Sequence, residues 1–120
     1  MKLIFEVNRM LDSLNGKLLV YASSFTCRGS RMKSVSTAAE KMARMLNLNV
    51  EVVTFREKFA PIYVYYKNGD EEPIPIYCNK GEKSDIQEIC KALRNMMFVL
   101  SFDPKHSALK QMRKEIMRFS

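Results

Sequence analysis

Metal-binding and disulfide-forming residues are scarce in this chain of 120 residues. It has a single histidine, His106, and its three cysteines, Cys27, Cys78 and Cys90, are widely separated. No pair of cysteines has the C-x2-C spacing of a zinc site, and an odd, scattered set does not form a disulfide framework. We therefore expect no metal, no cofactor and a reducing compartment. His106 is interpreted as an exposed polar residue, and Cys78 and Cys90 as core residues.

Long apolar runs are also missing. No stretch approaches the roughly 20 apolar residues that span a bilayer, so we expect no membrane-spanning helix. Residues 1–7 include Glu6 and lack a small-residue cleavage site, so we do not expect a secretory signal. No tract is dominated by proline, serine or glycine, which argues against wholesale disorder. The length predicts a single domain over residues 1–120, with an N-terminal helix (1–16), a core (17–102) and a basic C-terminal helix (103–120).

The positive charge of the chain is concentrated in two segments. The formal net charge is +7; residues 26–46 hold five basic residues against one acidic residue, and residues 103–120 hold five against two. Charge of one sign gathered in this way favours a polyanion such as RNA, and a solvated helix face is the alternative. We predict that RNA or a protein partner binds the following basic residues: Arg28, Arg31, Lys33, Lys41, Arg44, Lys105, Lys110, Arg113, Lys114 and Arg118.

The spacing of apolar residues predicts four helices and four strands in the order α-β-α-β-β-β-α-α. Apolar residues recur at helical spacing in four segments, and short β-rich or apolar runs lie between them. Asp103 followed by Pro104 is typical of a helix start and opens one last basic helix. The expected helices cover residues 3–14, a segment from before 32 to near 47, 84–100 and 104–116; the expected strands cover 17–21, 49–55, 62–66 and 74–78.

Turn and cap signals place these elements more closely. Asn68-Gly69 is the signature of a tight hairpin turn between two strands. Pro73 and Pro75 cannot donate hydrogen bonds to a neighbouring strand, so the strand over 74–78 should lie at a sheet edge or pair through its other side. Ser84 begins a capping box with Gln87 at the start of the third helix.

A resemblance to the thioredoxin fold follows from the order of these motifs over residues 17–95. The run 60–70, with Pro61 before an apolar strand and Asn68-Gly69 after it, resembles the second half of that fold. The first half has a matching strand, a loop with Cys27-Arg28-Gly29-Ser30, a helix and a second strand. The resemblance implies an α/β domain with a four-stranded mixed sheet flanked by helices, and a cis Ala60–Pro61 bond.

Three departures separate the chain from a working thioredoxin. Ser30 stands where the second cysteine of the dithiol would be, and the usual tryptophan and proline of that motif are missing. Only five residues separate Phe55 from Pro61, which leaves no room for the helix that normally precedes the proline. We therefore expect a protein that is not an enzyme.

A shortened version of the fold resembles one family more closely. It is the thioredoxin-like domain shared by a large-subunit and a small-subunit mitochondrial ribosomal protein and by a small accessory subunit of respiratory complex I. The similarity rests on the loop 27–33, the pair Arg56-Glu57, and the strand end Tyr66-Lys67-Asn68-Gly69 followed by acidic residues. It implies a structural protein of the mitochondrial matrix that binds rRNA and neighbouring ribosomal proteins and has no small-molecule substrate. The strand end favours the large-subunit member, and complex I subunits are the alternative partners.

Other candidate sites are weighed against simpler roles. Cys27, at a strand-to-helix junction, could act as a monothiol redox nucleophile, although no partner thiol is in view. Four tyrosines at strand positions could stack RNA bases or simply pack the sheet: Tyr63, Tyr65, Tyr66 and Tyr77. The acidic run 70–72 follows a turn and is interpreted as a solvated tip.

Overall fold

The computed structural model describes residues 16–26, 29–58, 60–81 and 85–119, and it has an α/β architecture. The helix expected within residues 1–16 lies outside this range. The elements are β1 (Lys17–Ser23), α2 (Ser30–Leu46), β2 (Asn49–Phe55), β3 (Ile62–Lys67), β4 (Ile74–Asn79), α3 (Ile86–Leu100), the 3-10 turn η1 (Pro104–His106), α4 (Ser107–Gln111) and α5 (Arg113–Arg118). All four predicted strands are present, each within two residues of its expected end.

The strands form one open mixed sheet in the order β2-β1-β3-β4. β1 pairs in parallel with β2, and β3 pairs antiparallel with both β1 and β4. The parallel pair is joined by α2, which is the crossover helix that such a pair needs. β4 lies at a sheet edge, as Pro73 and Pro75 predict, since an edge strand leaves half of its backbone groups without a strand partner.

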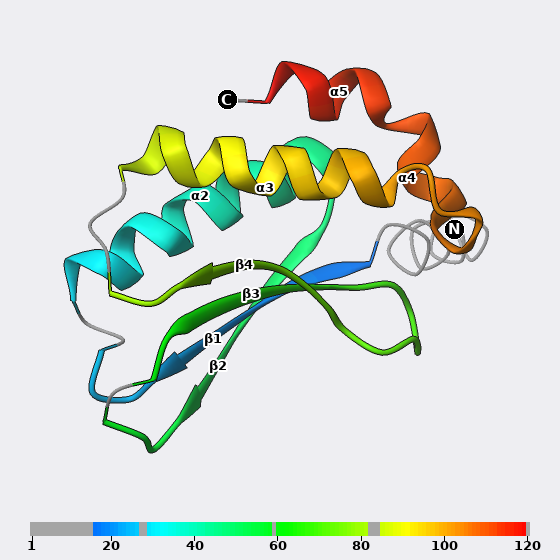
Figure 1. Cartoon of the computed structure of the whole chain (residues 1–120). Helices are drawn as coiled ribbons and strands as arrows, with labels where there is room; N and C mark the ends of the chain where they lie inside the picture. The colour runs from blue at the N-terminus through cyan, green and yellow to red at the C-terminus, as the bar shows by residue number, and fades with distance from the viewer. Residues whose placement is uncertain (1–15, 27–28, 59, 82–84, 120) are drawn as a thin grey trace, which may run out of the picture.

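Both long helices cover the same face of the sheet (Figure 1). The side chains of β1 and β3 that point toward them are fully buried: Leu18, Val20, Ala22, Ile62, Val64 and Tyr66. They meet the apolar stripe of α2, which recurs every three or four residues as an amphipathic helix requires. α3 packs beside α2 and over β4, with Leu93 and Met97 buried. No element among the described residues covers the opposite face of the sheet.

The helix predicted around Met32 to Asn47 is confirmed. It ends at Asn47, which takes the left-handed conformation (φ 55°) that asparagine tolerates better than most residues. α3 is also present, but its cap is Asp85, whose Oδ1 accepts the backbone N–H of Glu88 at 2.8 Å. Ser84, the predicted cap, lies outside the described residues. Within the described part of the chain, no helix is both long and apolar enough to cross a lipid bilayer.

The prediction of one continuous C-terminal helix is wrong. Asp103 does cap the start, since its Oδ1 accepts the backbone N–H of Lys105 at 2.9 Å, but only the turn η1 follows. α4 ends at Gln111, and Met112, with φ −99° and ψ 7°, separates it from α5. After the break, α5 packs on both α2 and α3, and Ile116 and Phe119 are buried there. Tertiary burial therefore outweighs the local preference for one straight helix.

Two expectations about the chain around β3 also need correction. The Ala60–Pro61 bond is trans, which is the ordinary state of a bond before proline. The β3–β4 connection contains the predicted turn, in which the Glu71 N–H donates to the Asn68 carbonyl at 3.1 Å. It is nevertheless not a tight hairpin, because residues 68–73 all lie between the strands. Pro73 cannot donate a ladder hydrogen bond, so regular pairing begins only after it.

Candidate nucleic-acid interface

The predicted basic residues of the first segment lie along α2. Arg28, like Cys27, lies outside the described residues. Lys33, Lys41 and Arg44 are exposed on the helix, and Arg44 in the last turn is favourably placed against the helix dipole. The helix begins after Gly29 with no side-chain cap and no acidic residue in its first turn, so this end is electropositive.

Arg31 is placed differently from its neighbours on α2. Its side chain is partly buried, and its Nε is buried without a hydrogen-bond partner in the structure. Its NH1 lies close to Gly81, 3.9 Å from the point where a Cβ would lie if that residue carried one. It therefore lies against the chain that follows β4. Arg31 and Lys33, two residues apart on α2, therefore differ in their surroundings, since Lys33 is exposed.

The basic residues of the second segment lie on three short elements. Lys110 on α4 and both Lys114 and Arg118 on α5 are exposed. α5 contacts α2 and α3 on the side of the helical layer that faces away from the sheet (Figure 1). The exposed cations of the helices α2, α4 and α5 are together called the basic helical surface: Lys33, Lys41, Arg44, Lys110, Lys114 and Arg118.

Arg113 holds the C-terminal helices to the rest of the fold. Its Nε donates to Ser101 Oγ at 3.1 Å and its NH2 donates to the Ser101 carbonyl at 3.0 Å. The guanidinium carbon lies 3.8 Å from the centre of the Phe102 ring, a cation–π contact. Ser101, itself 2% exposed, caps the end of α3. The structure thus gives Arg113 an internal role that its place in a basic segment does not reveal.

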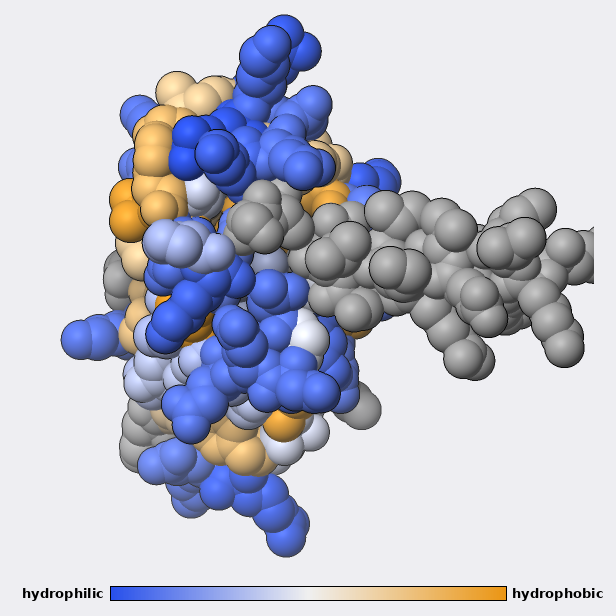
Figure 2. All heavy atoms as spheres, turned by 90° about the vertical axis from the view of Figure 1, so that its right-hand side faces the viewer, coloured by the Kyte–Doolittle hydropathy of each residue, from blue (hydrophilic) through white to orange (hydrophobic). Residues whose placement is uncertain are grey.

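Lys105 lies beside carboxylates. It lines a shallow hollow of about 600 Å³ together with Asp70, Glu71, Glu72, Asp103 and His106. This end of the molecule is covered mainly by hydrophilic side chains (Figure 2). The acidic run 70–72 is exposed, in agreement with a solvated tip. Among the described residues, no group of three or more histidine, cysteine or acidic side chains is arranged to hold a metal ion.

His106 is buried, contrary to the prediction of an exposed polar residue. It is 2% exposed, its ring meets the buried ring of Tyr66 edge-on with centroids 5.6 Å apart, and its Nδ1 has no hydrogen-bond partner in the structure. The turn η1 places it under the β3–β4 connection, so tertiary contact decides its environment. Burial, with a smaller contribution from the charge of Glu71, raises the pKa of Tyr66 to about 12.

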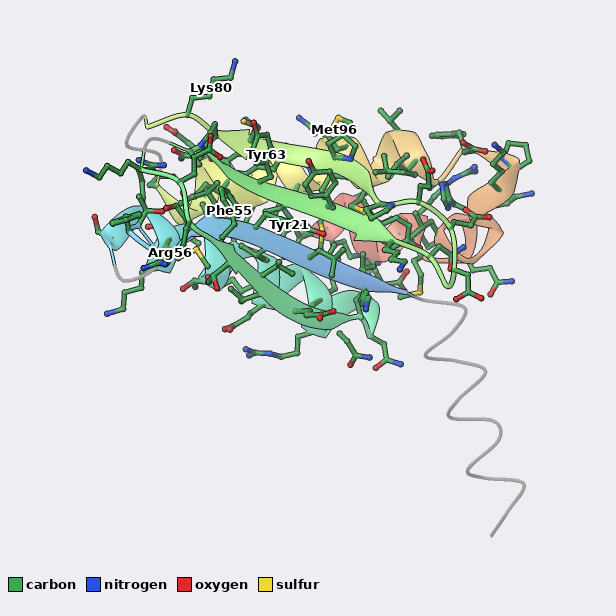
Figure 3. All side chains as sticks on the ribbon, turned by 90° about the horizontal axis from the view of Figure 1, so that it is seen from below. Tyr21, Phe55, Arg56, Tyr63, Lys80 and Met96 are labelled. Atoms are coloured by element: carbon green, nitrogen blue, oxygen red, sulfur yellow. The ribbon has the colours of Figure 1, made fainter. Side chains whose placement is uncertain are left out.

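The four candidate tyrosines divide between the two faces of the sheet. Tyr66 is fully buried on the helix side, and Tyr77 packs against the same core. Tyr63 and Tyr65 lie on the open face together with Tyr21, which is not among the four candidates. The rings of Tyr21 and Tyr65 meet edge-on at 5.1 Å, and those of Tyr63 and Tyr65 lie 6.0 Å apart. Figure 3 shows Tyr21 and Tyr63 on this face.

The described cysteines are not placed as nucleophiles. Cys90 is buried on α3, and burial raises the pKa of its thiol, with a smaller opposing effect of the charge of Lys41. A raised pKa keeps the thiol protonated and unreactive. Cys78 is half-buried opposite Tyr63 on the open face of the sheet, so its interpretation as a core residue is wrong.

Comparison with known proteins does not assign this chain to a family. No family model, no curated protein and no solved structure matches it.

Proposed function

We propose that this chain is a non-catalytic, thioredoxin-like structural protein of the mitochondrial ribosome, in its large subunit, that binds rRNA and neighbouring proteins. The observation that carries the proposal is the basic helical surface, where six cations of α2, α4 and α5 are exposed. Among the described residues, the only salt bridge joins Lys17 and Glu51, away from this surface. Unpaired, solvated cations on one layer provide the sequence-independent contacts that RNA phosphates require.

The thioredoxin-like part of the proposal is supported by the topology. A parallel β1-α2-β2 unit followed by an antiparallel β3-β4 pair, in the order β2-β1-β3-β4, is the arrangement that the resemblance implies. Between β2 and β3, the described residues 56–58 and 60–61 form no helix. The trans state of the Ala60–Pro61 bond removes one feature of the resemblance. Ser30 begins α2 where a dithiol would need its second cysteine, which favours binding over redox chemistry.

The open face of the sheet offers a second type of contact to RNA. Tyr21, Tyr63 and Tyr65 lie together there, and aromatic side chains on an uncovered sheet are able to stack unpaired bases. Such stacking is worth about 1–3 kcal/mol per base. We assign phosphate binding to the basic helical surface and base stacking to these tyrosines.

A second candidate is an accessory subunit of respiratory complex I. The observation that favours it is a row of exposed apolar side chains at one flank of α3, where Met96 is 38%, Val99 62% and Phe102 57% exposed. RNA phosphates gain nothing from such a row, whereas a protein neighbour would bury it. In the ribosome the same flank would face another ribosomal protein.

The particle with which the native protein purifies distinguishes these candidates. We expect the chain to sediment with mitochondrial large ribosomal subunits and to be released by high salt or by RNase. Purification with a membrane NADH dehydrogenase instead would contradict the ribosomal assignment and support complex I.

A matched pair of variants tests the basic helical surface itself. Lys114→Gln with Arg118→Gln should weaken binding to large-subunit rRNA and lower the slope of log affinity against log salt by about 1.4–1.8, because each lost phosphate contact removes about 0.7–0.9. Arg56→Gln with Lys58→Gln removes the same charge from the exposed β2–β3 connection and should leave the slope nearly unchanged. Equal effects of the two double variants would show that only net charge matters and that this surface is not the site.

A further inference from the structure

The two edges of the sheet are protected to different degrees. β4, at one edge, contains Pro75 and is preceded by Pro73, and proline at an edge prevents pairing with another chain. β2, at the other edge, contains no proline. Its one charged residue, Glu51, points to the open face and is paired with Lys17 at 2.9 Å. An edge strand of seven residues without such protection is a ready template for a further strand.

The backbone groups that β2 presents at its outer edge follow from its pairing with β1. The Phe55 carbonyl accepts the Ser24 N–H at 2.8 Å, so the backbone groups of Phe55 point toward β1. Because the direction alternates with each residue of a strand, the N–H and C=O groups of Val50, Val52 and Thr54 point outward. No described element lies beside this edge, and Figure 3 shows β2 at the margin of the sheet.

A groove of about 720 Å³ runs beside these groups, between β2 and α2. Val52 and Thr54 form its strand side, and Val52 is 50% exposed although it points to the helix side of the sheet. Residues of α2 and its cap form the other side: Gly29, Met32, Lys33, Ser36, Thr37 and Glu40. An added strand would place every second side chain in this groove and would cover Val52.

The charge of the groove differs along its length. Gly29 and Lys33 lie at the start of α2, where no side-chain cap and no acidic residue offsets the positive end of the helix. A carboxylate of the incoming strand is favoured at this end. Glu40 lies further along α2 and disfavours a second carboxylate there.

We propose that an extended segment of a partner protein adds to β2 as a fifth strand, with an apolar side chain against Val52 and a carboxylate beside Gly29 and Lys33. A second copy of the chain fits less well. Edge-to-edge pairing of two β2 strands would bring two α2 helices together across the junction, and each exposes Lys33, Lys41 and Arg44 against Glu40. The strand-addition site lies apart from the sheet face that carries the tyrosines, and it shares only Lys33 with the basic helical surface.

The test is selection of random peptides of about eight residues, displayed on phage, on the immobilised full chain. A parallel selection on Val52→Pro serves as the background. This variant removes an outward N–H that β1 does not use, so the fold should be retained while strand addition is blocked. We expect enriched peptides with alternating apolar residues and an acidic residue at one end.

Synthetic copies of the enriched peptides then define the site. Their affinity should fall at least about tenfold on Val52→Pro and about tenfold on Lys33→Glu, and it should be unchanged on Lys114→Glu, which lies on α5. In the unaltered chain, bound peptide should shift the backbone amide resonances of Val50, Val52 and Thr54 most strongly. This measurement decides the matter if Val52→Pro does not fold.

Four results would overturn the proposal. The first is that no peptide is enriched above the Val52→Pro background, and the second is that the enriched peptides bind Val52→Pro as tightly as the unaltered chain. The third is that bound peptide shifts only amide resonances of elements other than β2. The fourth is that Val52→Pro abolishes self-association or RNA binding instead, in which case the occupant of this edge is a second copy or RNA.

Discussion

Arg113 and Lys114 are adjacent cations of the same basic segment, and the structure predicts opposite consequences for their loss. Arg113 donates two hydrogen bonds to Ser101, and its guanidinium lies over the Phe102 ring. Lys114 is exposed. Replacement of either residue by glutamine removes one positive charge, so the two variants match in charge and differ only in the contacts they lose.

The magnitude follows from those contacts. Hydrogen bonds from a charged donor contribute about 1.5–3 kcal/mol when well buried, and an exposed cation–π contact about 0.5–1 kcal/mol. Arg113 is only half-buried, and water can replace part of what is lost, so we expect Arg113→Gln to cost about 2 kcal/mol. For a chain of 120 residues this corresponds to a decrease of roughly 6–10 °C in Tm. Lys114→Gln should change the free energy of unfolding by less than about 0.5 kcal/mol.

Urea unfolding of both variants, followed by circular dichroism, measures the difference. RNA affinity of the folded variants should show the reverse pattern, with the salt slope lowered by Lys114→Gln and nearly unchanged by Arg113→Gln. Arg113→Lys should recover little stability, because a lysine cannot donate in the planar fork that reaches both Ser101 oxygens. Equal stability of Arg113→Gln and Lys114→Gln would refute the assignment of Arg113 as an internal clamp.

Three further predictions concern the core and its edges. Because the pKa of Tyr66 is raised from 10.0 to about 12, the unfolded chain loses this proton first as pH rises, so the stability present below pH 10 should fall by about 2–3 kcal/mol between pH 10 and 12. Urea titrations over that range should show a smaller loss for Tyr66→Phe, and an identical loss would contradict the burial argument. Gly16 has φ +78°, and a Cβ there would clash with the Lys67 carbonyl oxygen, so Gly16→Ala should cost about 2–4 kcal/mol. Gly29 is the N-cap of α2, with a φ of −80° and a nearest contact for a Cβ of 3.4 Å, so Gly29→Ala should cost only about 0.5–1 kcal/mol. Leu93→Ala, at a site with 0% exposure, should lower the free energy of unfolding by about 3–5 kcal/mol, and a loss below 1 kcal/mol would mean that α3 does not pack as described.

The sheet could be predicted from the sequence because its signals are local. Valine, isoleucine and tyrosine runs of five to seven residues coincide with the observed strands, and Pro73 and Pro75 identify the edge strand. The alternation within β3 also separates Tyr66, which shares the parity of Ile62 and Val64, from Tyr63 and Tyr65. The same parity along β1 would have identified Tyr21 as a neighbour on the open face.

The C-terminal segment could not be predicted in the same way. Its apolar spacing is helical throughout, and the break at Met112 accompanies the packing of α5 on α2 and α3. His106 shows the same limit, because nothing near it in the sequence indicates that the Tyr66 ring will cover it. Contacts between residues distant in sequence determine both features.

The candidate interface illustrates why a count of basic residues overstates an RNA-binding surface. Both predicted segments are basic in sequence, but the fold uses the guanidinium of Arg113 internally, turns Arg31 toward the chain after β4, and places Lys105 among carboxylates. Counterion release depends on the cations that can reach phosphate, whereas the formal charge of +7 includes every one. The salt dependence of RNA binding should therefore follow the exposed cations of α2, α4 and α5. Variants at Arg31, Lys105 and Arg113 should alter stability or the local fold before they alter that slope.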